Sequence, residues 1–143
     1  MVFEEWDTHI QRKWEALNRF TQKLLSGPCG AQVAKIILFG SVAKDESRPE
    51  SDVDVLVFSF NGRESLREAC AEAAFEVAVE TGEGITPLVY PLSEYFSPRT
   101  YFTYRASRFG KEVFSVTDSE LNRDVLQLAR ELLGHLQQMA ADH

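Results

Sequence analysis

The sequence predicts an α/β fold, in which strands and helices alternate along one chain. Two short apolar runs of strand length, IILF and VDVLVF, lie in the first half and are separated by a polar loop. Longer segments with apolar residues at three- and four-residue steps come before and after these runs. The alternation of the two periodicities favours a sheet with helices packed against it.

The N-terminal segment is expected to form an amphipathic helix that ends before Gly27 and Pro28. Its predicted apolar stripe contains Phe3, Trp6, Ile10, Trp14, Leu17, Phe20 and Leu24. Because both tryptophans fall on this stripe, we expect them in the core rather than at a base-stacking surface. The run over 34–39 then predicts a buried strand.

A second strand is predicted over 52–60, where Asn61 and Gly62 end it. Helix-forming residues over 64–81 predict the next helix, and Gly82 is placed to stop it. The apolar face expected for this helix contains Leu66, Ala69, Cys70, Ala73 and Val77.

A short third strand is predicted over 85–90. It contains Pro87, which cannot donate a hydrogen bond to a neighbouring strand, so we expect this strand at an edge of the sheet. Ser97 and Pro98 resemble an N-cap and first-turn pair, and they predict a helix that ends by Gly110.

A last helix is predicted over about 118–141, because Thr117 and Glu120 form a capping-box pattern. Its apolar stripe can pack on its own sheet, on a second copy of the chain or on a different protein, and periodicity does not distinguish these. The length of 143 residues suits a single domain over 1–143, whose core we place at about 33–90.

The composition is that of a folded globular protein, with 44% hydrophobic and 26% charged residues. A net charge of -7 argues against long nucleic acid as a partner, because neutralising many phosphates needs a concentrated basic face. The first residues lack the pattern of a signal peptide, and no apolar run approaches the ~20 residues that span a bilayer. With Cys29 and Cys70 at no metal-binding spacing, we expect a soluble cytoplasmic protein that does not bind membranes.

Two acidic residues stand in the otherwise apolar second strand. Asp52 and Asp54 are two residues apart and share one face, while Val53, Val55 and Val57 point to the other. Two carboxylates held so close repel each other and lose solvation unless a cation lies between them. Oxygen ligands of this kind are typical of Mg²⁺ sites that the ion shares with substrate phosphates.

The polar loop before these aspartates carries groups that suit a phosphate-bearing ligand. Gly40 lets a phosphate approach the backbone, and Ser41 adds a hydroxyl group. Lys44 and Arg48 lie in the same loop and are expected to screen the charge of a triphosphate.

Together, Gly40-Ser41, ten intervening residues and Asp52-x-Asp54 resemble the motif of the minimal nucleotidyltransferases of the DNA polymerase beta superfamily. The resemblance covers about 33–90. It implies a small mixed sheet flanked by helices, with a helix at each end of the chain. It also implies transfer of a nucleoside monophosphate from a nucleoside triphosphate, with ATP expected, to a hydroxyl acceptor.

The resemblance further assigns roles to these residues and implies partners. Asp52 and Asp54 would be catalytic and bind Mg²⁺ or Mn²⁺, and Gly40 and Ser41 would hold the triphosphate. Members of this size resemble the antitoxin halves of two-component modules, whose partners are helical HEPN-type toxins modified on a hydroxyl side chain. From the apolar stripe of the last helix, a homodimer is a second expected assembly.

The sequence departs from the family pattern at two places. Asp45 stands where the family usually has a glycine, and the strand over 85–90 lacks the third carboxylate of active members. Glu83, two residues before that strand, is the candidate substitute, and Thr86 could at most hold a metal-bound water.

Other residue types that often act in catalysis have simpler interpretations here. The three histidines, His9, His135 and His143, are scattered, so we expect them at the surface or the terminus. Five aromatic residues in the second half are expected to pack in the core, with some lining a nucleotide or acceptor pocket. They are Tyr95, Phe96, Tyr101, Phe102 and Tyr104.

Two classes of function follow from the sequence. The first is a Mg²⁺-dependent nucleotidyltransferase. The second is a catalytically weak or inactive nucleotidyltransferase-fold protein that binds nucleotide or a protein partner as an antitoxin or regulator. The lack of a carboxylate on the third strand is the feature that divides them.

Overall fold

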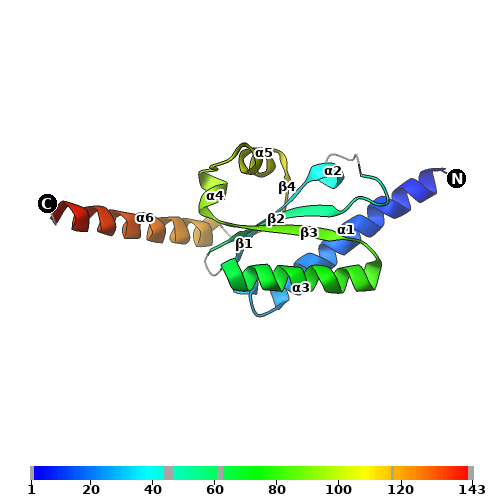
Figure 1. The fold of residues 1–143 in the computed structure, drawn as a ribbon, viewed down its shortest axis with the longest axis horizontal. Helices are drawn as coiled ribbons and strands as arrows, with labels where there is room; N and C mark the ends of the chain where they lie inside the picture. The colour runs from blue at the N-terminus through cyan, green and yellow to red at the C-terminus, as the bar shows by residue number, and fades with distance from the viewer. Residues whose placement is uncertain (1, 44–46, 61–62, 117, 142–143) are drawn as a thin grey trace.

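The computed structural model describes residues 2–43, 47–60, 63–116 and 118–141, with side-chain environments for 9–43, 47–60, 64–116 and 130–141. Its helices and strands alternate along the chain (Figure 1). In order they are α1 (Val2–Ser26), the 3-10 helix η1 (Gly30–Gln32), β1 (Val33–Phe39), α2 (Gly40–Ala43), β2 (Val53–Ser59), α3 (Arg63–Thr81), β3 (Ile85–Pro91), α4 (Ser93–Phe96), α5 (Tyr101–Phe109), β4 (Lys111–Ser115) and α6 (Asp118–Ala141).

The described strands form a mixed four-stranded sheet in the order β3-β2-β1-β4. Strand β1 runs antiparallel to β2 and to β4, whereas β2 and β3 are parallel and are joined by the crossover helix α3. This arrangement confirms the expected α/β class. It also confirms the edge position of β3, where Pro87 lacks only a hydrogen bond that an edge strand does not need.

Strand β4 was not predicted from the sequence. It is five residues long and pairs with β1 across an irregularity in the register between Ile36 and Ile37. Its first two residues, Lys111 and Glu112, are exposed, so the segment lacks the apolar alternation that would have marked it as a strand. Its pairing with β1, rather than an apolar pattern of its own, accounts for its strand conformation.

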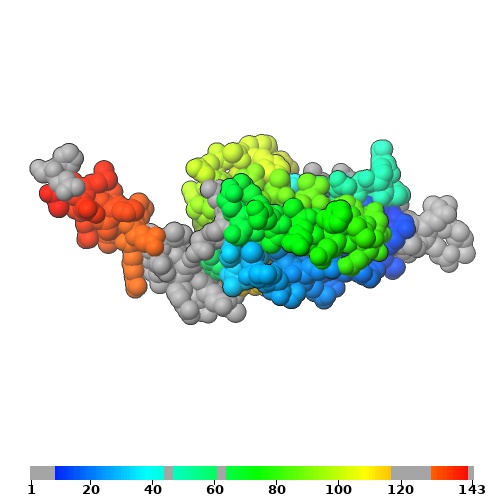
Figure 2. Space-filling model, turned by 60° about the horizontal axis from the view of Figure 1, so that its bottom comes forward, coloured from blue at the N-terminus to red at the C-terminus, as the bar shows by residue number. Residues whose placement is uncertain are grey.

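The sheet separates two layers of packing. Helices α1 and α3 lie on one face and α4 and α5 on the other (Figure 1), while α3 runs beside α1 across the surface in Figure 2. The inward residues of β2 alternate accordingly: Val53, Val55 and Val57 pack with α1 and α3, and Leu56 and Phe58 pack toward α4 and α5. The face under α1 and α3 carries the larger core.

The buried stripe of α1 differs from the predicted one. His9 and Lys13 are buried, as are Ala16, Leu17 and Phe20, whereas Trp14 is 38% exposed. The expectations of a core Trp14 and a surface His9 were therefore wrong. The helix is rotated so that two polar side chains reach the loop before β2, which supplies oxygen partners for both.

The N-cap of α5 also differs from the prediction. Ser97 ends α4, and the Oγ1 atom of Thr100 accepts a hydrogen bond from the backbone N–H of Thr103 at the start of α5. Glu94 ties the two helices together, because its carboxylate accepts hydrogen bonds from Arg99 and from the Thr103 hydroxyl. Hydrogen bonds from the Arg99 side chain and backbone lower the pKa of Glu94.

Helix α6 extends away from the rest of the molecule (Figure 1). The predicted capping residue Thr117 lies outside the described residues. In the part of α6 whose side chains are described, the large apolar side chains are exposed, which differs from packing on the chain's own sheet. They are Leu132, Leu133, Leu136 and Met139. Within the described ranges, no helix is long and apolar enough to cross a membrane.

Candidate active site

Asp52 and Asp54 lie at the beginning of β2, on the face of the sheet that α4 and α5 cover only in part. Asp54 pairs in register with Phe39 at the end of β1 and with Thr86 on β3. The Thr86 hydroxyl donates a hydrogen bond to Oδ2 of Asp52 at 3.3 Å. Asp52 is exposed and Asp54 is half-buried, so both carboxylates are accessible from the open corner of this face.

Two glycines border the carboxylates closely. Gly40 has φ +77°, and a Cβ atom on it would lie 2.5 Å from Oδ2 of Asp54. A Cβ atom on Gly84 would lie 2.4 Å from Oδ1 of Asp52. The backbone therefore reaches each carboxylate without an intervening side chain. Gly40 opens α2 and Ser41 follows it, so the first residue of the predicted phosphate-binding pair lies directly beside Asp54.

Gly40→Ala is expected to destabilise the fold by more than the roughly 1–2 kcal/mol of a left-handed residue, because its methyl group also collides with Asp54. Gly82→Ala is the matched control, since Gly82 has φ +78° and open space where its Cβ atom would lie. Urea unfolding of both variants measures the difference. Equal losses in the two variants would show that Gly40 does not pack tightly against Asp54.

The charges of the two aspartates favour a cation between them. Burial raises the pKa of Asp54, and the negative charge of Asp52 raises it further. A divalent ion relieves both effects, because it compensates the lost hydration and the repulsion. Carboxylate and hydroxyl oxygens are the donors present at this corner, and they suit Mg²⁺ or Mn²⁺ rather than a metal that prefers sulfur or nitrogen.

The loop before β2 is held by Lys13 of α1, whose side chain is 0% exposed. Its Nζ atom donates hydrogen bonds to the carbonyl of Pro49 at 3.2 Å, to the carbonyl of Ser51, and to Oε2 of Glu83 at 3.0 Å. Ser51 immediately precedes Asp52. Lys13 thus connects α1 to the backbone that positions the first aspartate.

Further hydrogen bonds order the same loop. Nε2 of His9 lies 3.2 Å from Oγ of Ser47. The loop closes on itself through the N–H of Arg48, which donates to Oγ of Ser51, and the N–H of Ser51, which donates to the carbonyl of Arg48. The Arg48 side chain is exposed, and Lys44 lies outside the described residues.

Glu83 lies at the end of the site where β3 begins, but its carboxylate is engaged by Lys13, and the Nε atom of Arg12 is 4.0 Å away. Thr86 occupies the position on β3 that pairs with Asp54. Within the described part of the chain, no third acidic, histidine or cysteine side chain joins the two aspartates in a metal-binding cluster.

Sequence reasoning did not find Lys13 or His9. The available signal was their four-residue spacing in line with Leu17 and Phe20, which puts two polar side chains within a buried stripe. A buried lysine needs oxygen partners, so this pattern could have pointed to a contact with a loop.

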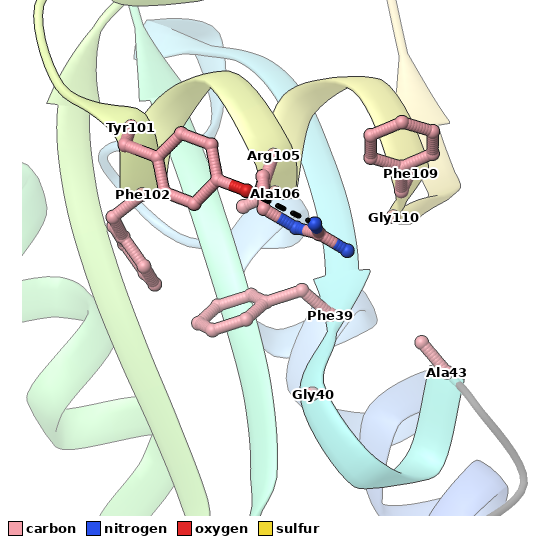
Figure 3. A pocket seen from close by; sticks show the side chains of 9 residues that line it. All are labelled: Phe39, Gly40, Ala43, Tyr101, Phe102, Arg105, Ala106, Phe109 and Gly110. Carbon is pink, nitrogen blue, oxygen red and sulfur yellow. Dashed lines mark hydrogen bonds between the residues drawn. The ribbon is translucent and has the colours of Figure 1, made fainter.

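A cavity of about 340 Å³ lies between α5 and the end of β1; we call it the α5 cavity (Figure 3). Phe39 and Gly40 form one side, and Tyr101, Arg105 and Phe109 of α5 form the other. The expectation that the aromatic residues of this segment pack in the core was wrong for the four that are exposed, which are Phe96, Tyr101, Phe102 and Tyr104. Tyr101 and Phe102 line the cavity instead. Because Gly40 borders both the cavity and Asp54, the two sites are continuous.

The sequence model of the nucleotidyltransferase domain family matches residues 15–103, which include Gly40, Ser41 and both aspartates. This chain belongs to that family. The match covers more than half of the chain and confirms the resemblance seen in the sequence motif. In this nucleotidyltransferase domain, the motif residues and the strands that carry them lie within the matched region.

A solved structure of a mutant of the toxin–antitoxin MntA–HpeT is similar to this chain at 17% sequence identity and a TM-score of 0.47. The alignment covers 85% of this chain and 93% of that chain. No curated protein sequence matches the chain.

Proposed function

We propose that this nucleotidyltransferase domain transfers a nucleoside monophosphate from a nucleoside triphosphate, with ATP expected, to a hydroxyl acceptor in the presence of Mg²⁺ or Mn²⁺. The observation that carries the proposal is the corner where Asp52 and Asp54 share one open face beside the Gly40 backbone. At that corner a pair of carboxylates can hold metal ions, and the glycine backbone leaves room for a phosphate to come close. The reaction needs both features.

Each residue at the corner has a role in this proposal. Asp52 and Asp54 hold the divalent ions, which when bound neutralise the triphosphate and lower the pKa of the acceptor hydroxyl. The backbone at Gly40 and the hydroxyl of Ser41 bind phosphate oxygens, and the exposed Arg48 adds positive charge nearby. In the transfer, the acceptor oxygen bonds to the α-phosphorus, the bond to pyrophosphate breaks, and the acceptor proton is released.

A second candidate function is binding without turnover. Two observations favour it: Glu83 is paired with Lys13, and Thr86 stands opposite Asp54 where a third carboxylate would lie. In that case the domain binds nucleotide or a protein partner as an antitoxin or regulator. In the enzymatic proposal, Glu83 remains the candidate third carboxylate.

A protein partner is part of either proposal. The exposed apolar face of α6 supports it, because residues of this size are rarely exposed together without a partner. A HEPN-type helical protein is the partner implied by the sequence resemblance, and a second copy of this chain is the alternative.

ATP binding is expected to require Mg²⁺ or Mn²⁺, because the phosphates and the two aspartates repel each other without a cation. Calorimetric titration of ATP with metal and with excess EDTA measures this, and we expect binding to be weakened by about 100-fold or more in EDTA. Equal affinity in both buffers would contradict the metal site. Transfer of label from radioactive ATP to a co-expressed protein then separates the enzyme from the binding protein.

A further inference from the structure

The α5 cavity begins at the residue that also borders Asp54. Gly40 lines the cavity, and the following residue, Ser41, carries the proposed phosphate contact. We propose that the α5 cavity binds the purine base of the nucleoside triphosphate. This inference rests on the proposed function, since it uses the triphosphate position at Gly40 and Ser41.

One wall of the cavity is a row of three stacked side chains along α5, which we call the α5 ladder: Tyr101, Arg105 and Phe109. The guanidinium carbon of Arg105 lies 5.8 Å from the ring centre of Tyr101 and 5.2 Å from that of Phe109. An N–H of Arg105 donates a hydrogen bond to the Tyr101 hydroxyl at 3.2 Å (Figure 3). The i, i+4 spacing places the three groups in one line, so the planar cation is held between two aromatic rings.

The opposite side of the cavity is formed by the end of β1. Phe39 points toward α5 (Figure 3), and its ring meets that of Phe102 edge-on, with centres 5.3 Å apart. Phe39 directly precedes Gly40, so an aromatic ring lies next to the phosphate position. A ligand whose phosphates lie at Gly40 can therefore place its base against Phe39 and the α5 ladder.

The chemistry of the lining suits a base. Among the described residues around the cavity, Tyr101 and Arg105 are the polar side chains, and the others are apolar or glycine. Arginine only donates hydrogen bonds, and a purine offers ring-nitrogen acceptors and a large flat face for stacking. A volume of about 340 Å³ falls within the range of small-molecule pockets.

The test compares ATP with inorganic tripolyphosphate, both with Mg²⁺, by calorimetry on the full chain. We expect ATP to bind about tenfold more tightly or better, because only ATP fills the cavity. Tyr101→Ala and Arg105→Ala should remove most of this difference while leaving tripolyphosphate affinity nearly unchanged. GTP should bind similarly to ATP, and CTP and UTP about threefold or more weakly, because pyrimidines stack over a smaller area.

The same helix offers a matched control. Tyr104 and Arg108 form an equivalent stacked pair at 5.7 Å that does not line the cavity. Tyr104→Ala and Arg108→Ala should leave the preference for ATP unchanged.

Equal affinity for ATP and tripolyphosphate would overturn the inference and leave the cavity to another occupant, such as an aromatic side chain of an acceptor protein. A preference for ATP that survives both cavity variants would place the base elsewhere and also overturn it. CTP binding as tightly as ATP would overturn the purine assignment. If neither ATP nor tripolyphosphate binds, the proposed function itself fails, which is a distinguishable result.

Discussion

Asp54→Asn is expected to abolish measurable transfer of label from ATP, with a loss of at least about 100-fold. In the proposed function Asp54 holds the divalent ions, and removing one charged ligand costs several kcal/mol of transition-state stabilisation, where each 1.36 kcal/mol is a factor of ten in rate. The fold should persist. Burial and the charge of Asp52 both disfavour the ionised Asp54 carboxylate in the metal-free protein. The Asp54→Asn variant should therefore unfold at the same urea concentration as the wild type or at a higher one.

The matched control for Asp54→Asn is Glu50→Gln, which removes an exposed carboxylate from the loop before β2. It should transfer label at the wild-type rate, because the Glu50 side chain is exposed and has no role in the proposed site. Transfer that persists in Asp54→Asn would contradict the assignment of this aspartate. If the wild-type chain, incubated with labelled ATP and its candidate partner, transfers no label, the binding function replaces the enzymatic one.

Lys13→Met is expected to destabilise the protein by about 3–5 kcal/mol, because it leaves a buried carboxylate and two loop carbonyls without their cation. Glu83→Gln should be destabilising for the converse reason, since the buried ammonium group of Lys13 loses its counter-charge. Urea unfolding measures both. Lys23→Met is the control: its ion pairs with Glu76 and Glu80 are at the surface, where such a pair contributes less than about 1 kcal/mol.

The double variant Lys13→Met with Glu83→Leu separates a structural from a catalytic role of Glu83. Replacing both partners by apolar groups should recover much of the stability lost in either single variant. If this double variant folds, binds ATP with Mg²⁺ and still transfers label, Glu83 positions the loop and is not a third metal ligand. Loss of transfer in the double variant but not in Lys13→Met, with ATP binding intact in both, would instead support Glu83 as the third carboxylate.

The mutual position of the two aspartates could be predicted from the sequence because it depends on a local rule. Side chains two residues apart on a strand share a face, so Asp52-x-Asp54 placed both carboxylates together before any fold was known. Gly82, with φ +78°, ends α3 where the sequence predicted it. The family also followed from local order, since the motif from Gly40 to Asp54 is continuous in the chain.

The surroundings of the aspartates were decided by contacts between distant segments. Which side of α1 faces the core depends on two loop carbonyls, 36 and 38 residues further along the chain, that accept hydrogen bonds from Lys13. These bonds hold Lys13 inward and leave Trp14 half-exposed. The strand β4 exists because β1 offers it an edge to pair with. The periodicity of α1 places Lys13 on the buried stripe but does not identify the loop that it contacts, and β4 carries no apolar alternation.

The environment of Glu83 and the α5 cavity were likewise decided only by the tertiary structure. Glu83 meets a lysine 70 residues earlier in the chain, and Tyr101 and Arg105 meet Phe39 across the gap between α5 and β1. A sequence pattern shows which face a residue takes on its own element. The pattern does not show which other element packs against that face. That choice depends on burying apolar area and pairing charges and hydrogen bonds over the whole chain at once, which happens only when the sheet and its helices assemble.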